Sequence, residues 1–288
     1  MMRSAIVPAA DKITRDPEAT AMAIKTSIHG ETTVVTIDRI EARNAVNPAM
    51  ADALFKAFIA FDRDDSQKVA ILAGVPGAFC AGFDLKAAAD IGRDETWFAE
   101  LDLEPGGHDD QPRKGPMGPT RLVLSKPVIA AISGPAVAGG MELALWCDMR
   151  VMERSAYMGV YCRRWGVPLI DGGTVRLPRI VGHGRAMDLI LTGRKVEADE
   201  CLAIGLASRV CEDGAALDTA LEIAAQLARF PQACMRADRL SAIRQWSKDP
   251  GAALAGEWKS AETFRAEGAD GAARFSSGKG RGGDFGEI

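Results

Sequence analysis

This sequence lacks several features that would mark a metal site, a membrane span or an exported protein. Its three histidines lie far apart and its six cysteines include no Cys-x-x-Cys pair, so we expect reduced thiols and no metal centre. No apolar run reaches the roughly 18 residues of a membrane span, so no membrane contact is expected. The N-terminus lacks the charged and apolar pattern of a signal peptide, which predicts a cytoplasmic protein.

A broad basic stripe is also absent. The net charge is -4 and the isoelectric point is near 5.6, so the chain has no electrostatic footprint for nucleic acid. Its 288 residues are 47% hydrophobic and 26% charged, enough to bury a substantial core in one or two domains. We therefore expect a soluble globular protein that does not bind nucleic acid.

Residues 129–148 combine a short apolar run, a glycine turn and a helical pattern. The run 129–132 suits a buried strand, and the pair Gly139-Gly140 precedes the helix. The first turn of a helix has unpaired N–H groups and a partial positive charge, so it can hold an oxygen that becomes negative. Glu142 would place a carboxylate beside these donors. Taken alone, the segment favours a tight connection with an ordinary first-turn acid.

A second segment changes this interpretation. Residues 69–74 form another apolar run, followed by Phe79-Cys80-Ala81-Gly82-Phe83-Asp84-Leu85. Together the segments resemble the enoyl-CoA hydratase/isomerase (crotonase) superfamily, in which a Phe-x-Ala-Gly-x-Asp-Leu turn faces a Gly-Gly-x-Glu-Leu-Ala turn. The resemblance implies that the N–H groups of Phe83 and Gly139 form an oxyanion hole around a thioester carbonyl. An acyl-CoA enolate carries its charge on that oxygen, where preorganised donors contribute strongly to catalysis.

The resemblance spans roughly residues 28 to 280 and implies an α/β fold. The expected architecture is a crotonase-like spiral of repeated ββα units with a C-terminal helical trimerisation region. Residues 1–27 mix charge, Ala and Pro without a period, so we expect a disordered tail. Residues 28–214 would form the spiral core with the acyl-CoA site. Residues 215–288 would form the helical oligomerisation region of a homotrimer or homohexamer.

Local patterns predict the first elements of the core. Residues 32–38 read as a strand, preceded by a turn at His29-Gly30. Asn47 is suited to cap a helix that has Pro48 at its first position. The apolar residues that follow recur at helical spacing and should face the core: Met50, Leu54, Phe55, Phe58 and Ile59.

The resemblance also assigns substrate contacts. It places backbone around Ala42 against coenzyme A, and Phe275 at a position from which a neighbouring chain covers it. Lys86 lies where the family often has a basic residue near the diphosphate, although a lysine after a turn is commonly just exposed. Coenzyme A is part of the substrate, so no separate cofactor is expected. The two signature turns contribute the remaining expected contacts: Ala81, Asp84, Leu85 and Gly140.

One position departs from the family pattern. Hydratases of the family carry a second glutamate where this chain has Cys162. A thiol with a free pKa of about 8.5 is a poor substitute near neutral pH unless positive charge lowers that pKa. Arg163 and Arg164 are candidates for this effect, whereas a buried cysteine is more often an inert small hydrophobe. Cys162 is therefore expected to line the substrate site in one of these two roles.

Asp171 is the nearest candidate for a replacement carboxylate. It follows Cys162 by nine residues and precedes Gly172-Gly173. It is either a second catalytic acid or the cap of the helix that begins after the glycines. Upstream, Trp97 and Phe98 either line an acyl tunnel or hold their helix against the core.

The predicted function is hydration of a 2-enoyl-CoA through an enolate held in the oxyanion hole, with Glu142 transferring a proton. One alternative is an enoyl-CoA double-bond isomerase that uses Glu142 as its single base. Another is a non-catalytic acyl-CoA-binding protein. Cys162 favours the last alternative and Glu142 opposes it. The acyl chain and the pathway remain open.

Overall fold

Two β-sheets form the centre of the protein in a computed structural model, which describes residues 23–92, 94–103 and 113–280. The larger sheet has six strands in the order β1-β2-β3-β4-β6-β9, and the smaller has three in the order β5-β7-β8. Strands β2, β3, β4, β6 and β9 are parallel, whereas β1 and β8 pair antiparallel with their neighbours. The strands are β1 Ile24–His29, β2 Thr32–Ile37, β3 Val69–Gly74, β4 Val128–Ile132, β5 Pro135–Val137, β6 Met149–Glu153, β7 Tyr157–Gly159, β8 Val196–Glu197 and β9 Arg209–Cys211.

Helices cover both faces of the larger sheet. The α-helices of the body are α2 Pro48–Arg63, α3 Leu85–Ile91, α4 Glu95–Glu100, α5 Gly139–Trp146, α6 Gly173–Val181, α7 His183–Thr192, α8 Ala198–Ala203 and α9 Ala216–Arg229. The C-terminal α-helices are α10 Gln232–Arg244, α11 Pro250–Lys259, α12 Ala261–Thr263 and α13 Ala269–Ser276, with a π-helical turn at Phe264–Gly268. Short 3₁₀ helices lie at Ile40–Ala42 (η1), Pro119–Arg121 (η2), Tyr161–Trp165 (η3) and Gln245–Ser247 (η4). No described helix is both long and apolar enough to cross a membrane.

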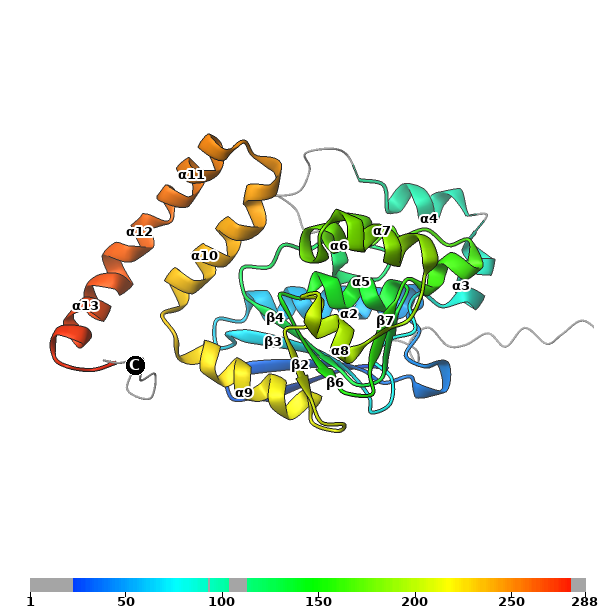
Figure 1. Cartoon of the computed structure of the whole chain (residues 1–288), viewed down its shortest axis with the longest axis horizontal. Helices are drawn as coiled ribbons and strands as arrows, with labels where there is room; N and C mark the ends of the chain where they lie inside the picture. The colour runs from blue at the N-terminus through cyan, green and yellow to red at the C-terminus, as the bar shows by residue number, and fades with distance from the viewer. Residues whose placement is uncertain (1–22, 93, 104–112, 281–288) are drawn as a thin grey trace, which may run out of the picture.

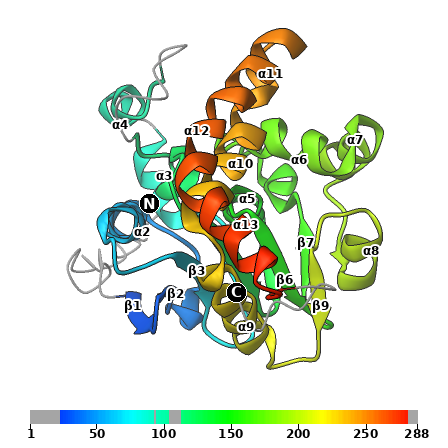
Figure 2. The same ribbon diagram turned by 90° about the vertical axis from the view of Figure 1, so that its left-hand side faces the viewer.

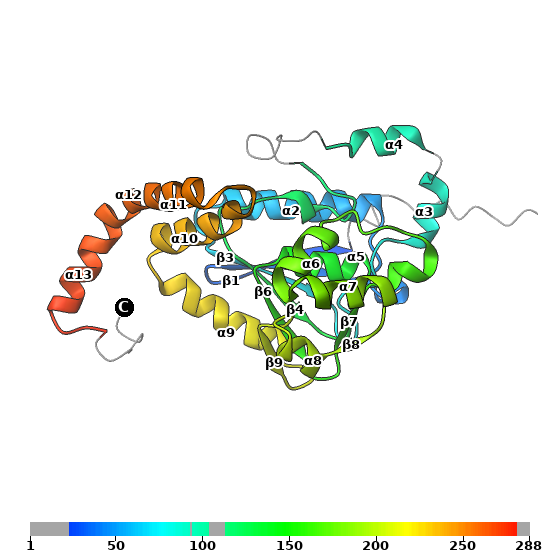
Figure 3. The same cartoon turned by 45° about the horizontal axis from the view of Figure 1, so that its top comes forward.

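Alternation along the central strands divides the core into two layers. In β3, Val69 and Ile71 belong to the smaller apolar cluster, whereas Ala70 and Leu72 belong to the larger one. Successive side chains of a strand point to opposite faces, so a fully buried strand must be apolar at every position. Helix α9 covers the face of the smaller cluster, and α2 and α5 contribute to the larger one (Figure 3).

Strand β1 corrects the predicted boundary of the core. It begins at Ile24 and pairs with β2 from Ile24↔Ile37 to His29↔Thr32. The expectation of a disordered tail through residue 27 is therefore wrong for residues 24–27, and the rest of that tail, up to residue 22, lies outside the described residues. The strand is largely exposed and polar. Backbone pairing at the sheet edge holds it, so apolar periodicity could not reveal it.

Helix α2 follows the predicted pattern. The Asn47 side chain accepts a hydrogen bond from the N–H of Met50 at 3.0 Å, and Pro48 occupies the first helical position. Met50, Leu54 and Phe58 are fully buried. The Phe58 ring also lies edge-on to Trp146 of α5, with centroids 4.8 Å apart. This contact fixes α2 against the helix that carries Glu142.

Helix α9 corrects the predicted start of the C-terminal region at residue 215. Ala216, Ala220 and Ala224 are buried at four-residue spacing in the smaller cluster, against β3, β4 and β6. The helix therefore belongs to the core. Beyond it, α10 to α13 extend away from the sheet (Figure 1) and lie nearest the viewer in Figure 2. Arg239 ties α10 to the body through Asp148 at 2.8 Å.

Substitution Phe58→Ala tests the α2–α5 contact. We expect the free energy of unfolding to fall by about 3–5 kcal/mol, because the change removes a fully buried ring and leaves a cavity. Chemical denaturation measures the loss. Lys56→Ala is the matched control, since Lys56 is exposed on the same helix and its change should stay within about 0.5 kcal/mol. Equal effects would contradict the packing described here.

Candidate active site

Two backbone N–H groups face the same space between the turn after β3 and the start of α5. Val46 donates to the carbonyl of Gly82 and accepts from the N–H of Asp84, both at 2.8 Å. This parallel bridge leaves the N–H of Phe83 on the opposite side of the turn. Gly139 begins α5, so its N–H has no partner within the helix. In the described parts of the chain, neither N–H donates to a protein acceptor.

Close backbone contact holds these two turns together. The N–H of Cys80 donates to Pro135 at 3.0 Å, and Val137 donates back to Cys80 at 3.0 Å. A Cβ on Gly140 would lie 2.1 Å from the carbonyl oxygen of Cys80, so only glycine allows this approach. Gly82 has φ +99°, and a Cβ there would lie 3.0 Å from the nitrogen of Gly139. The glycines of both signatures therefore serve the contact between the turns.

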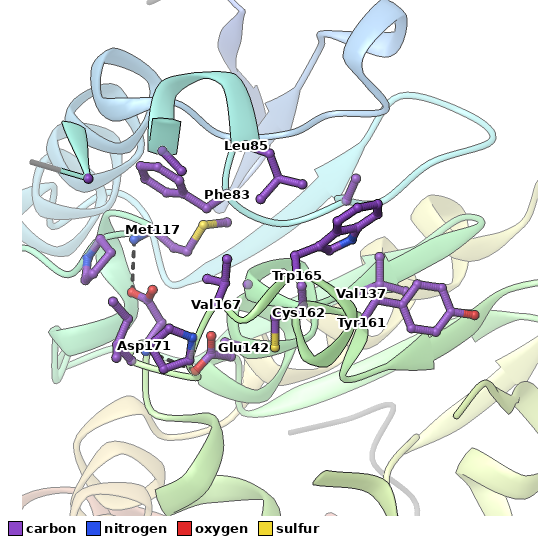
Figure 4. Close-up of a pocket in the computed structure, with 18 of the residues that line it drawn as sticks. Phe83, Leu85, Met117, Val137, Glu142, Tyr161, Cys162, Trp165, Val167 and Asp171 are labelled. Carbon is purple, nitrogen blue, oxygen red and sulfur yellow. Dashed lines mark hydrogen bonds between the residues drawn. The ribbon is translucent and has the colours of Figure 1, made fainter. Parts of the chain in front are cut away.

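A cavity of about 480 Å³ opens beside the two N–H groups (Figure 4). Seven of the predicted site residues line it: Ala81, Phe83, Leu85, Gly139, Glu142, Cys162 and Asp171. Trp97 and Phe98 also line it, as one of their two predicted roles required, and the Trp97 ring lies 5.9 Å from that of Phe83. Sequence reasoning missed several apolar wall residues, which have no motif of their own: Met117, Val137, Tyr161, Trp165, Val167 and Ile170.

A second cavity of about 350 Å³ adjoins the same turn. Its lining contains five predicted substrate contacts: Ala42, Ala81, Asp84, Leu85 and Lys86. The Asp84 carboxylate is already engaged, since it accepts from the N–H of Lys86 at 2.9 Å and from Arg39 at 2.8 Å. Asp84 therefore caps α3 and braces the turn. Lys86 also lines this cavity, and its side chain is exposed.

Two predicted contacts lie outside both cavity linings. Gly140 stands behind the turn, against Cys80. Phe275 lies on α13, where its side chain is 60% exposed. The prediction for Phe275 concerns a neighbouring chain, so it stays a prediction.

Glu142 lies on the first turn of α5 with its carboxyl group in the cavity wall. One carboxyl oxygen, Oε1, accepts from the N–H of Asp171 at 2.9 Å and from the N–H of Gly173 at 2.8 Å. A Cβ on Gly173 would lie 2.8 Å from that oxygen, so the glycine makes room for the carboxylate. Burial and the neighbouring Asp171 charge raise the pKa of Glu142 to about 8, although the two N–H donors and Arg176 oppose this shift.

Asp171 is buried beside Glu142, with 3% of its surface exposed. Its Oδ1 accepts from the N–H of Met117 at 2.9 Å and from the hydroxyl of Thr120. Helix α6 begins at Gly173 with no side-chain cap, so the interpretation of Asp171 as a helix cap is wrong. Burial raises the pKa of Asp171. The two carboxyl groups thus lie together at one end of the cavity (Figure 4).

Comparison with known proteins shows which family the chain belongs to. The family model "Enoyl-CoA hydratase/isomerase" matches residues 27–275. The chain belongs to the enoyl-CoA hydratase/isomerase family. Enoyl-CoA hydratase EchA19 of Mycobacterium tuberculosis is 39% identical over 202 residues, which cover 68% of this chain and 70% of that protein.

Other relatives agree with this membership. Carnitinyl-CoA dehydratase of Salmonella arizonae is 37% identical and covers 67% of this chain and 69% of its own length. The crystal structure of enoyl-CoA hydratase EchA1 from Mycobacterium marinum superposes with a TM-score of 0.78 at 32% identity, covering 88% of this chain and 96% of that one. These likenesses confirm the predicted crotonase fold, and the protein is an enzyme of the enoyl-CoA hydratase/isomerase family.

Cys162 is a wall residue of the cavity in this enoyl-CoA hydratase/isomerase family member. It lies in η3, is 4% exposed, and burial together with the Glu142 charge raises the pKa of its thiol. Arg163 opposes the shift, but its Nε donates to the carbonyl of Ile190 at 3.2 Å. The Arg164 guanidinium lies over the Tyr161 ring, 4.0 Å from its centroid. The thiol therefore stays protonated near neutral pH, and the activated-thiol alternative is wrong.

The raised pKa of Glu142 predicts how stability depends on pH. Between pH 4.5 and 8 the folded protein holds a proton that the unfolded chain releases, so stability falls as pH rises through this window. Glu142→Gln removes this loss. As pH rises, the free energy of unfolding of Glu142→Gln minus that of wild type should therefore increase, by up to about 1.4 kcal/mol per pH unit. The increase should level off above the pKa of Glu142 in the folded protein.

Chemical denaturation across pH 4 to about 9 measures this difference. Glu222→Gln is the control, because Glu222 is exposed on α9 and its replacement should change stability by less than about 0.5 kcal/mol at every pH. A difference between wild type and Glu142→Gln that does not vary with pH would contradict the burial of an acid with a raised pKa.

Proposed function

We propose that this enzyme adds water to the double bond of a 2-enoyl-CoA. The observation that carries the proposal is the opening of two unpaired N–H groups and two buried carboxyl groups onto one cavity. The names of its relatives support the same reaction class, since they include enoyl-CoA hydratases and a carnitinyl-CoA dehydratase.

The substrate would span the two cavities. The thioester oxygen binds the N–H groups of Phe83 and Gly139, with the acyl chain in the larger cavity among Trp97, Trp165 and other apolar side chains. The smaller cavity takes part of coenzyme A, where Lys86 attracts a phosphate. Apolar walls with few polar groups suit a ligand whose reacting end alone is polar.

The two acids divide the proton transfers. Because Glu142 and Asp171 are buried next to each other, the pair retains one proton near neutral pH and titrates as a unit. The ionised carboxylate takes a proton from water while the oxygen of that water forms a bond to the β-carbon. The double-bond electrons move toward the thioester oxygen, where the two N–H groups stabilise the negative charge. The protonated carboxyl group then donates to the α-carbon, which restores the thioester.

Double-bond isomerisation is the second candidate. It is favoured by Cys162, because its protonated thiol stands where the resemblance places the second glutamate of hydratases. An isomerase needs one group that removes a proton at one carbon and returns it at another, and Glu142 can do both. The non-catalytic alternative is weaker, since a binding protein gains nothing from two adjacent buried acids, whose burial costs stability.

Turnover of crotonyl-CoA and of a 3-enoyl-CoA tests these reactions. Glu142→Gln should lower kcat about 10²–10⁴-fold, because it removes a general acid–base group. Asp171→Asn should lower kcat for hydration at least about 10-fold, whereas an isomerase with Glu142 as sole base would tolerate it. Cys162→Ser is the matched control in the same wall and should change kcat less than about threefold, since we assign the thiol no proton transfer.

Product analysis separates the candidates. A 3-hydroxyacyl-CoA from crotonyl-CoA supports hydration, and a conjugated 2-enoyl-CoA from the 3-enoyl substrate supports isomerisation. No turnover of either compound, despite saturable binding in a titration, would contradict both and leave a binding protein or another thioester reaction.

We also propose that the enzyme is a homotrimer or homohexamer assembled through its C-terminal helices. Helices α10 and α11 bury no residue within one chain, and Trp258 is 78% exposed while Leu254 is 64% exposed. Large apolar side chains gathered on a helical extension are typical of an interface. Sedimentation equilibrium should give the mass of three or six chains, and the mass of one chain would contradict the proposal.

A further inference from the structure

Arg176 reaches from α6 toward the active-site wall without being part of it. Its Nη1 donates to the carbonyl oxygen of Asp171 at 2.9 Å, and its Nη2 donates to the carbonyl oxygen of Thr120 at 2.6 Å. The side chain is partly buried and does not line the cavity. One guanidinium thus bridges two backbone segments that are about 50 residues apart in sequence.

Both carbonyls belong to residues that hold the acids. Asp171 gives its N–H to Oε1 of Glu142, and Thr120 gives its hydroxyl to Oδ1 of Asp171. A single residue therefore connects the guanidinium to each carboxyl group: Asp171 to that of Glu142, and Thr120 to that of Asp171. The intervening Gly172 has φ +91°, and a Cβ there would lie 2.1 Å from Nη1 of Arg176. Glycine at this position is needed for the arginine to reach the turn.

We propose that Arg176 is a positioning residue, which fixes the Glu142 and Asp171 carboxyl groups relative to each other and balances the negative charge of the pair. It acts through backbone, so we do not assign it contact with substrate. The inference rests on the proposed function, because it names the residue that holds the acids of that reaction in place.

Two arginines near the acids can balance their charge: Arg176 lowers the pKa of both carboxyl groups, and Arg121 lowers that of Asp171. Among the described residues, the elements packed most closely against α5 are α6, β5 and η2, and α2 contacts its far end through the Phe58 ring. Helix α6 contributes Arg176 and Arg179, η2 contributes Arg121, and β5 contains only Pro, Ala and Val. Elsewhere in the described chain, Cys162 of η3 is coupled to Glu142 and Cys147 after α5 is coupled to Arg176. Of the described arginines on α6 and η2, Arg176 acts on both carboxyl groups, whereas Arg121 acts on Asp171.

The chemistry of the side chain explains why arginine is needed. A guanidinium is planar, always charged, and carries donors in a fixed fork that can hold two carbonyl oxygens at once. A lysine ammonium supplies the charge as a single point on a flexible stem. Arg176→Lys therefore keeps the charge and loses the bridge, whereas Arg176→Gln loses both.

Steady-state kinetics across pH, with the substrate that wild type turns over, tests the proposal. For Arg176→Gln we expect kcat to fall about 10–100-fold through misplaced acids, while KM stays within about threefold because no substrate contact is lost. The acidic limb of the kcat profile should also move up by about one pH unit, since a cation that favours the ionised pair is gone. Arg176→Lys should lose kcat with a smaller displacement of that limb.

Arg179→Gln is the matched control on the same helix. Arg179 is exposed, and its guanidinium lies 5.2 Å from the centroid of the Trp246 ring. Its profile should superimpose on that of wild type. An Arg176→Gln enzyme with unchanged kcat and an unmoved acidic limb would overturn the proposal. So would a loss confined to KM.

Amide hydrogen exchange provides a readout that does not need turnover. In Arg176→Gln the N–H groups of Asp171 and Gly173, which bind Glu142, should exchange faster than in wild type, with no such change in Arg179→Gln. Unchanged protection would overturn the positioning role even in an active enzyme. If Glu142→Gln proved as active as wild type, the proposed function would fail, while faster exchange in Arg176→Gln would still support the positioning role.

Discussion

The burial of two neighbouring carboxyl groups is the constraint on which this active site depends. An ionised acid removed from water is costly unless donors replace the lost solvent, and two such acids repel each other. The chain supplies N–H groups to Glu142, an N–H and a hydroxyl to Asp171, and one guanidinium to the backbone between them. These partners come from loops, from the short 3₁₀ helix η2 and from the first turn of α6. The two acids therefore connect the segments around residues 117–120 and 171–173, which lie outside the β-sheets.

Glycines make this crowding possible. Substituting a side chain at Gly173 would press on Glu142, and at Gly172 on Arg176. Gly115 follows the same logic, because a Cβ there would lie 2.2 Å from the Thr120 hydroxyl oxygen and 2.8 Å from Oδ1 of Asp171. At these positions, and at Gly140 behind the oxyanion turn, the absence of a side chain lets neighbouring groups approach the backbone closely. The polar end of the cavity is consequently built mostly from main chain.

Features of the fold and the site could be predicted from sequence where they depend on residues that are close together along the chain. The turn at 79–85 and the helix start at 139–142 are local, since strand, glycine turn and first-turn N–H groups lie within a few residues of each other. Their fold and family were accordingly predicted. Helix α2 was equally local, from its Asn47 cap to its buried face.

Features that depend on distant partners escaped prediction. Nothing near Asp171 in sequence indicates that its side chain binds Thr120 and the N–H of Met117, more than 50 residues earlier. Strand β1 lacks an apolar pattern because it pairs through backbone at an edge. The small side chains of α9 read as a separate helical region until their contact with the sheet places them in the core.

The position of Asp171 has a consequence for how the two acids can act. Its own N–H is one of the donors to Glu142, so the residue that supplies one acid also orients the other. A carboxylate at position 162, on η3, would have no such covalent link to the Glu142 donors and could adjust its distance independently. Here any shift of the 171–173 turn moves both groups. The pair must therefore work at one relative geometry, and α6, which begins at Gly173 and carries Arg176, becomes the element that sets it.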